Sequence, residues 1–207
     1  MRLLMDRPQA LAEPWRRFFA RDGGIGLLYG NAPLTRLALY GITLAAMTPR
    51  EVWVLDGANS FDAYLVARWA RQWQPAPEAL LARIHLARAF TCYQMSELII
   101  RKLGAALQPF SPATIVGLGF LETFYDEDVP LTDAVRLLQS VLARLTELVQ
   151  QGHTVLLTAR ELPSHARPSE RSGLMNLLKA AATHTWRVDV ITPPPSPVPT
   201  QWPLIVA

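Results

Sequence analysis

The chain has 207 residues, of which 50% are hydrophobic and 18% are charged, and its formal net charge is +3. This composition is typical of a globular protein and excludes a disordered chain. The small positive charge permits contact with nucleic acid but does not require it. The single cysteine, Cys92, excludes an intramolecular disulfide and a cysteine-rich metal site, and it indicates a reducing compartment.

The start of the chain does not have the pattern of a secretory signal. Its apolar run is interrupted by Asp6, Arg7 and Pro8. No uncharged apolar segment of the sequence reaches the ~18 residues that a membrane span needs. These features predict a cytoplasmic protein with no membrane contact.

Short apolar runs alternate along the chain with segments whose apolar residues repeat at helical spacing. Strands are predicted at residues 24–30, 51–57, 84–89, 114–119 and 154–159. Helices are predicted at residues 33–47, 62–73, 91–106 and 131–152. Strands that alternate with crossover helices are typical of an α/β fold, so we expect a mostly parallel central sheet with helices on both faces.

The two ends of the chain depart from this alternation. Residues 1–22 mix aromatic and arginine side chains and predict a helical segment packed on the core, with a single domain over residues 23–207. Towards the other end, predicted strands at 185–192 and 203–207 flank a proline-rich run. Because no helix separates these two strands, they predict a C-terminal antiparallel hairpin at an edge of the sheet.

The first predicted strand ends at Gly30 and leads into a helix, which is the setting of a phosphate-binding P-loop. A P-loop reads G-x-x-x-x-G-K-[ST], and its glycines, lysine and hydroxyl group hold the phosphates and Mg²⁺. Here Asn31 follows Gly30, and Thr35 stands in the place of the second glycine. Arg36 replaces the lysine, and Leu37 replaces the hydroxyl residue. The loop thus has the position of a P-loop without most of its phosphate-binding groups.

Further segments, in this order along the chain, resemble the RecA/RadA recombinase family. The segment 52–73 resembles its second strand and following helix, and 83–99 resembles its third strand. The segment 114–160 resembles its Walker B strand, first DNA loop, long helix and fifth strand, and 181–207 resembles its closing hairpin. With the Gly30 loop, the resemblance spans residues 22–207 and is nearest to the compact RadB-like proteins and the eukaryotic recombinase paralogues. It implies a RecA-like P-loop core.

The chain departs from the family at the residues that hydrolyse ATP. Ala58 stands where the family has a glutamate that activates water, and Gly117 stands where it has the Walker B aspartate. With the changes in the Gly30 loop, these losses predict a pseudo-ATPase that holds no cofactor. The resemblance then implies a non-catalytic protein of DNA recombination or repair, or of its regulation. It would act by binding a protein partner, such as another RecA-like protein or a polymerase.

Two other functions stay open at this point. In the first, Arg36 neutralises phosphate together with residues of a partner, which would make the chain a noncanonical ATPase that binds ATP and Mg²⁺. In the second, the fold serves as a regulatory binding module without a role on DNA.

The segment after the fifth predicted strand, residues 159–173, holds the position of the family's second DNA-binding loop. Its candidate DNA contacts share a basic side chain: Arg160, His165, Arg167 and Arg171. Several cations on one loop favour weak, sequence-tolerant contact with phosphates. The alternative is a solvated loop of mixed charge, since Glu161 and Glu170 dilute it and no aromatic residue is present to stack on bases. The acidic segment 122–128 would repel DNA.

Overall fold

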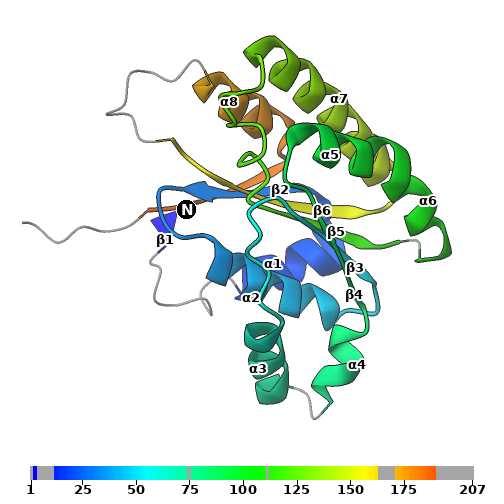
Figure 1. The fold of residues 1–207 in the computed structure, drawn as a ribbon. Coiled ribbons are helices and arrows are strands. Elements are labelled where there is room, and N and C mark those ends of the chain that lie inside the picture. The colour runs from blue at the N-terminus through cyan, green and yellow to red at the C-terminus, as the bar shows by residue number, and fades with distance from the viewer. Residues whose placement is uncertain (1, 4–11, 74–75, 111, 163–170, 190–207) are drawn as a thin grey trace, which may run out of the picture.

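The structure, a computed structural model, describes residues 2–3, 12–73, 76–110, 112–162 and 171–189. Its strands form one sheet in the order β1-β7-β2-β6-β5-β3-β4, and every neighbouring pair is parallel (Figure 1). In chain order the strands are β1 Arg2–Leu3, β2 Gly24–Gly30, β3 Val52–Asp56, β4 Ile84–Arg88, β5 Thr114–Leu118, β6 Thr154–Arg160 and β7 His184–Val188.

Helices cover both faces of this sheet (Figure 1). One face carries α1 Ala12–Arg17, the π-helical turn η2 Phe18–Asp22, α2 Thr35–Ala46, α3 Ala63–Trp73 and α4 Pro77–Leu81. The other face carries α5 Cys92–Glu97, η3 Leu98–Lys102, α6 Leu103–Leu107, η4 Gln108–Phe110, α7 Leu131–Gln150 and α8 Ser172–Ala181. The predicted α/β fold with a parallel sheet between two helical layers is therefore confirmed.

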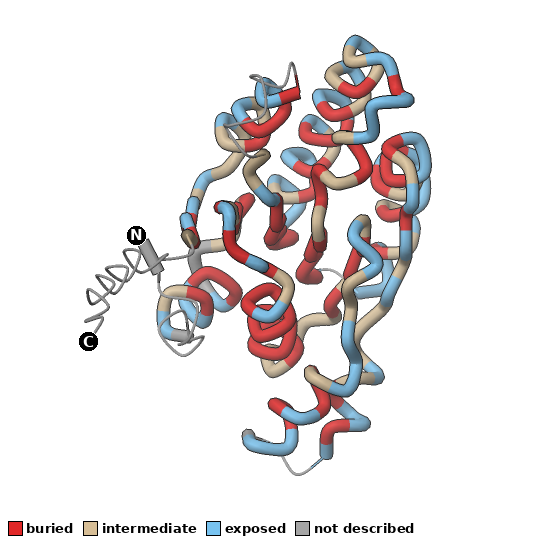
Figure 2. The backbone as a smooth tube through the Cα atoms, turned by 60° about the vertical axis from the view of Figure 1, so that its left-hand side comes forward, coloured by how far each residue is buried: buried red, intermediate tan, exposed pale blue. Residues whose placement is uncertain are grey.

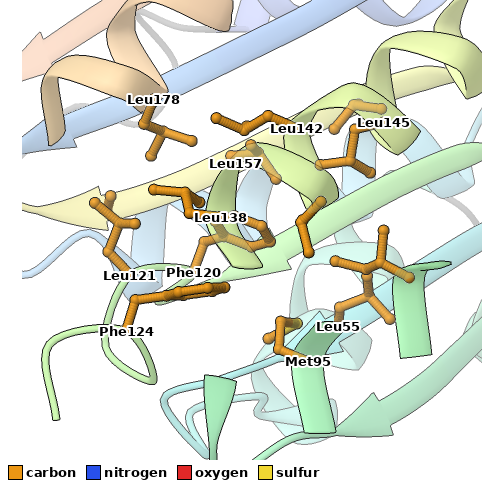
Figure 3. Close-up of a cluster of buried hydrophobic side chains, with 14 of the residues drawn as sticks. Leu55, Met95, Phe120, Leu121, Phe124, Leu138, Leu142, Leu145, Leu157 and Leu178 are labelled. Carbon is orange, nitrogen blue, oxygen red and sulfur yellow. The ribbon is translucent and has the colours of Figure 1, made fainter. Parts of the chain in front are cut away.

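The strands are apolar on both sides because each side meets a layer of helices. Leu27 and Leu55 pack into the cluster under α5, α7 and α8, whereas Leu28 and Val54 pack into the cluster under α1 to α4. Successive side chains of a strand point to opposite faces, so neighbouring residues serve the two cores. Figure 3 shows the first cluster, where leucines of α7 lie against residues of the strands and of the segment after β5. In Figure 2, buried residues line the sheet and the inward sides of the helices.

All described strand pairs are parallel, so the predicted antiparallel hairpin is not confirmed, and the predicted edge position of β7 is wrong. β7 lies between β2 and β1 and runs parallel to both. The reason is its connection: β7 follows the crossover helix α8, and a strand reached through a crossover helix returns parallel. The second strand of the expected hairpin, residues 203–207, lies outside the described residues. Arg2–Leu3, which the sequence places in a helical segment, form the strand next to β7 instead.

The aromatic residues of the N-terminal segment are part of the second core. Trp15, Phe18 and Phe19 are all buried, and their rings meet one another and Trp186 of β7 edge-to-face. Gly41 of α2 lies against the Trp15 ring, where a β-carbon would be 2.6 Å from a ring atom. Burial of three large aromatic side chains fixes α1 and η2 to the sheet.

Candidate functional site

The carboxyl ends of the parallel strands meet along one edge of the sheet, which we call the carboxyl edge. Gly30 at the end of β2 is in register with Arg160 at the end of β6, and Asp56 at the end of β3 is in register with Arg88 at the end of β4. Ligand sites of open parallel sheets lie at this edge. The fold therefore brings the predicted Gly30 loop, the Ala58 position and Arg160 to the place where a nucleotide would bind in such a fold.

Gly30 itself is explained by packing rather than by phosphate binding. Its φ is +147°, and a β-carbon there would lie 1.8 Å from the carbonyl oxygen of Val188. Its own carbonyl accepts the N–H of Glu161 at 2.8 Å. Only glycine allows β7 to approach so closely. The glycine that suggested a P-loop is thus required by the neighbouring strand.

The loop after Gly30 is filled by its own apolar side chains. Ala32, Leu34 and Leu37 are buried and pack into the core beneath α2. Leu37 stands where a P-loop has its Mg²⁺-binding hydroxyl, so that position faces the core. Thr35 begins α2 and is partly buried, and Asn31 is exposed.

Arg36, which stands in the place of the P-loop lysine, lies at the start of α2. Its side chain is exposed in the first turn of α2. The N-terminus of a helix carries partial positive charge, so a cation in the first turn is not stabilised by the helix. Arg36 therefore lies on the surface of the molecule.

Asp56 is a buried acidic residue at the carboxyl edge, and its carboxylate is already satisfied by hydrogen bonds. The side chain is 1% exposed and accepts the main-chain N–H groups of Ala58, Ser60 and Phe61 at 2.9–3.3 Å. The Nε of Arg88 lies 3.8 Å from it. A carboxylate with this many donors shapes the loop after β3. This role gives Asp56 a structural reason to be present without a metal ion.

The two positions that lack the catalytic carboxylates differ in their surroundings, since Gly117 is buried and Ala58 is exposed. A β-carbon on Gly117 would lie 2.8 Å from both Leu157 and Phe120 side chains. Gly119 approaches Ala58 so closely that a β-carbon on it would collide with that of Ala58. A carboxylate at position 117 would therefore be buried among apolar groups, which is strongly unfavourable without a partner.

The chain matches no protein-family model, and no curated protein matches it significantly. Its function must therefore be inferred from the site. Across the described residues, no helix is long and apolar enough to cross a membrane. The same residues contain no group of three or more His, Cys, Asp or Glu side chains that could hold a metal ion.

The predicted DNA-binding residues are not equivalent in the structure. Arg160 is exposed, and its Nε lies 3.4 Å from a carboxylate oxygen of Glu122. Arg171 is buried and donates to the main-chain carbonyls of Phe124 and Val129, the first at 2.8 Å. Its guanidinium braces the acidic segment after β5 instead of facing a ligand. The other two candidates, His165 and Arg167, lie outside the described residues.

Sequence reasoning missed an open strand edge. Among the described strands, β4 pairs with β3 alone. Ala89, just after β4, donates its N–H to the carbonyl of Asp56 in β3. Main-chain groups alternate in direction along a strand, so the N–H and C=O groups of Leu86 and Arg88 face away from the sheet. These groups can pair with an added strand.

Exposed apolar side chains surround this edge. Leu86 is 40% exposed, Tyr93 49% and Phe90 67%. A cavity of about 470 Å³ opens beside them, and its lining includes Arg88, Phe90, Tyr93, Gln94, Leu98 and Lys102. A sequence signal existed in "IHLARAF", since β4 contains neither lysine nor proline, and its arginine, Arg88, stands at the end of the strand. We call β4 with Phe90 and Tyr93 the β4 surface.

Proposed function

We propose that the chain is a non-catalytic RecA/RadA-like protein that acts in DNA recombination or repair, or in its regulation, by binding a protein partner at the β4 surface. The observation that carries this proposal is an unblocked strand edge beside two exposed aromatic side chains. The lone, buried Cys92 suits a reducing cytoplasmic setting for such a protein.

A RecA-like core is supported by the position of the resembling segments. The strand, loop and helix around Gly30 follow one another as in a P-loop fold. The strand that resembles the Walker B strand, β5, lies beside the one that resembles the second strand, β3. Both end at the carboxyl edge, where the family places its catalytic residues.

The absence of catalysis is supported by the chemistry of that edge. ATP hydrolysis needs groups that neutralise charge on the transferring phosphoryl group, and losing several such groups removes most of the rate acceleration. Here the loop is filled by Ala32 and Leu34, and the carboxylate of Asp56 is bound by main-chain N–H groups. Weak contact with DNA phosphates through exposed Arg160 fits the same proposal.

Partner binding at the β4 surface follows from the physics of strand addition. An extended peptide that pairs with a strand edge gains main-chain hydrogen bonds, and its side chains enter neighbouring pockets. The cavity beside Phe90 and Tyr93 offers such a pocket, with Lys102 at its rim able to lie near an acidic or aromatic group. Aromatic residues in pockets are the usual anchors of protein interfaces.

The test uses the full chain with the active RecA-like recombinase of its host, and separately with a translesion polymerase of that host. We expect binding that weakens at least about tenfold in Phe90→Ala and Leu86→Lys. The matched control is Tyr64→Ala, because Tyr64 is 90% exposed on α3, which covers the other face of the sheet. Equal binding by all three variants, or binding of neither partner, would contradict the proposal. Phosphate release from ATP that depends on Arg36 would favour the noncanonical ATPase instead.

A further inference from the structure

A second polar cavity lies at the opposite edge of the sheet, where the strands begin. Gly24 at the start of β2 is in register with Thr154 at the start of β6. A cavity of about 330 Å³ opens at this point, and its lining includes Phe19, Arg50, Val149, Gly152, His153 and Thr154. We call it the amino-edge cavity. Strands β2 and β6 separate it from the Gly30 loop.

The charged group of this cavity is Arg50, and no described carboxylate opposes it. Its Nη1 donates to the hydroxyl oxygen of Thr154 at 3.1 Å. No carboxylate of the described residues lies within ion-pair distance of Arg50, and none lines the cavity. The cavity beside β4 differs, since Glu97 contributes to its lining. The amino-edge cavity therefore carries a net positive charge.

The imidazole of His153 supplies a second, oriented donor. The ring is 5% exposed, and its Nδ1 accepts the main-chain N–H of Ala113 at 3.0 Å. This bond assigns the proton of the neutral ring to Nε2, which is left to donate. Burial lowers the pKa of His153 below its usual value, and the charge of Arg50 lowers that pKa further. Among the described residues, Arg50 is the charged group that bears on the ring.

The remaining groups complete a small donor-lined site. The Thr154 oxygen accepts from Arg50, so its hydroxyl hydrogen can donate elsewhere. Gly152 has a φ of +95°, and the nearest atom to a β-carbon there would be 4.0 Å away, so the space beside this lining residue is not filled by described residues. Phe19 and Val149 add apolar contact area.

We propose that the amino-edge cavity binds a phosphate group, either as inorganic phosphate or at the end of a small organic phosphate. A guanidinium binds phosphate oxygens through paired N–H groups, and the imidazole and hydroxyl can donate to the remaining oxygens. The cavity has the volume of a small-ligand site and lacks an acidic group among its described lining residues, which would repel the ligand. This site is separate from the β4 surface.

The binding also depends on the protonation state of the ring. Burial keeps the pKa of His153 below its usual value, so the ring is neutral at pH 7, with Nδ1 accepting from Ala113 and Nε2 left to donate. Protonation would place a hydrogen on Nδ1 against the N–H of Ala113 and break that bond. The phosphate group also takes up a proton and loses negative charge between about pH 7 and 6. Lowering the pH towards 6 therefore weakens binding.

The test is isothermal titration of the full chain with inorganic phosphate, at constant ionic strength set with chloride. We expect saturable binding that weakens about tenfold or more in Arg50→Gln. Thr154→Val should weaken it less. Arg101→Gln is the matched control, because Arg101 is an exposed arginine of η3 and its partner is Glu97. Circular dichroism confirms that each variant is folded, and Arg50→Lys retains the charge if Arg50→Gln does not fold.

Two further measurements identify the ligand and the pH dependence of its binding. Tighter binding of glycerol 3-phosphate than of phosphate would assign the site to an organic phosphate, and the reverse order to the free ion. Binding by wild type should weaken from pH 7 to 6, and His153→Gln should reduce this change to the part that comes from the phosphate group itself. No heat of binding at about 10 mM phosphate, a concentration that reveals even weak affinity, would overturn the proposal. Equal affinity in Arg50→Gln and wild type would overturn it as well.

Discussion

The two ends of strand β2 are surrounded in opposite ways. At the carboxyl end, Gly30 is enclosed by the Val188 carbonyl, and the following loop is sealed by Ala32 and Leu34. At the amino end, the same strand borders an open cavity with Arg50 and His153. The carboxyl end, which has the sequence context of a phosphate-binding loop, is closed. The amino end, which has no such motif, presents hydrogen-bond donors. A glycine before a helix therefore does not show what the backbone around it can bind.

Gly30→Ala gives the sharpest test of the closed end. A β-carbon would collide with the Val188 carbonyl and would force an unfavourable φ. We expect the free energy of unfolding to fall by about 3 kcal/mol or more, measured by urea denaturation. Gly173→Ala is the control, since no atom lies within 4 Å of its β-carbon position in α8. That change should stabilise the protein by up to about 1 kcal/mol. Equal effects of the two substitutions would show that Gly30 is not packed in this way.

Arg171→Met tests whether this arginine braces the fold or meets a ligand. The substitution leaves the carbonyls of Phe124 and Val129 without their donor in a buried place. We expect a loss of about 2 kcal/mol in the free energy of unfolding. Arg136→Met is the control, because Arg136 is 69% exposed and pairs with Asp133 on α7; it should change stability by less than about 0.5 kcal/mol. A stable Arg171→Met protein with weakened DNA binding would show instead that Arg171 contacts DNA.

The strands were predictable because their apolar composition reflects burial by helices on both faces of the sheet. Residues 24–30 are both the predicted strand and the observed β2, and the strands predicted at 84–89 and 114–119 differ from β4 and β5 by one residue. Runs of apolar, often β-branched residues between breaks are expected wherever a strand is covered on both faces. Local sequence is enough for this part of the fold.

What could not be predicted depends on contacts between residues far apart in the chain. Nothing near Gly30 indicates that Val188 lies against it, or that Arg2–Leu3 pair with β7. A two-residue strand has no periodicity to detect. The candidate sites could not be predicted from the sequence for the same reason. Arg50 and His153 come together only because the connection from α2 to β3 brings Arg50 against Thr154 at the start of β6. The β4 surface is open only because β4 is last in the order of the described strands.

The pH dependence of stability sharpens the comparison at the amino end. His153 has a pKa below its usual value in the folded protein because it is buried, so the unfolded chain binds the proton more readily. Its contribution to stability is therefore complete above the unfolded pKa, near 6.5, and is lost as the pH falls towards the folded pKa. We expect the free energy of unfolding to fall below about pH 6.5, by at most about 1.4 kcal/mol per pH unit. His153→Gln should reduce that slope in urea denaturation, and an unchanged slope would exclude His153 as its source.

The smallest effect concerns Arg160 at the carboxyl edge. If single-stranded DNA binds there, Arg160→Ala removes one phosphate contact and flattens the plot of log affinity against log salt by about 0.7. The loss should be the same for all sequences, because phosphate contacts carry no base information. Fluorescence anisotropy with labelled oligonucleotides measures it, and Arg136→Ala on α7 is the control.

The effect is small because Arg160 already lies near Glu122, and that ion pair competes with the phosphate for the guanidinium. An unchanged slope would place the DNA contact on another surface. No binding by the wild type at about 50 mM salt, where phosphate contacts are strong, would leave partner binding at the β4 surface as the proposed function.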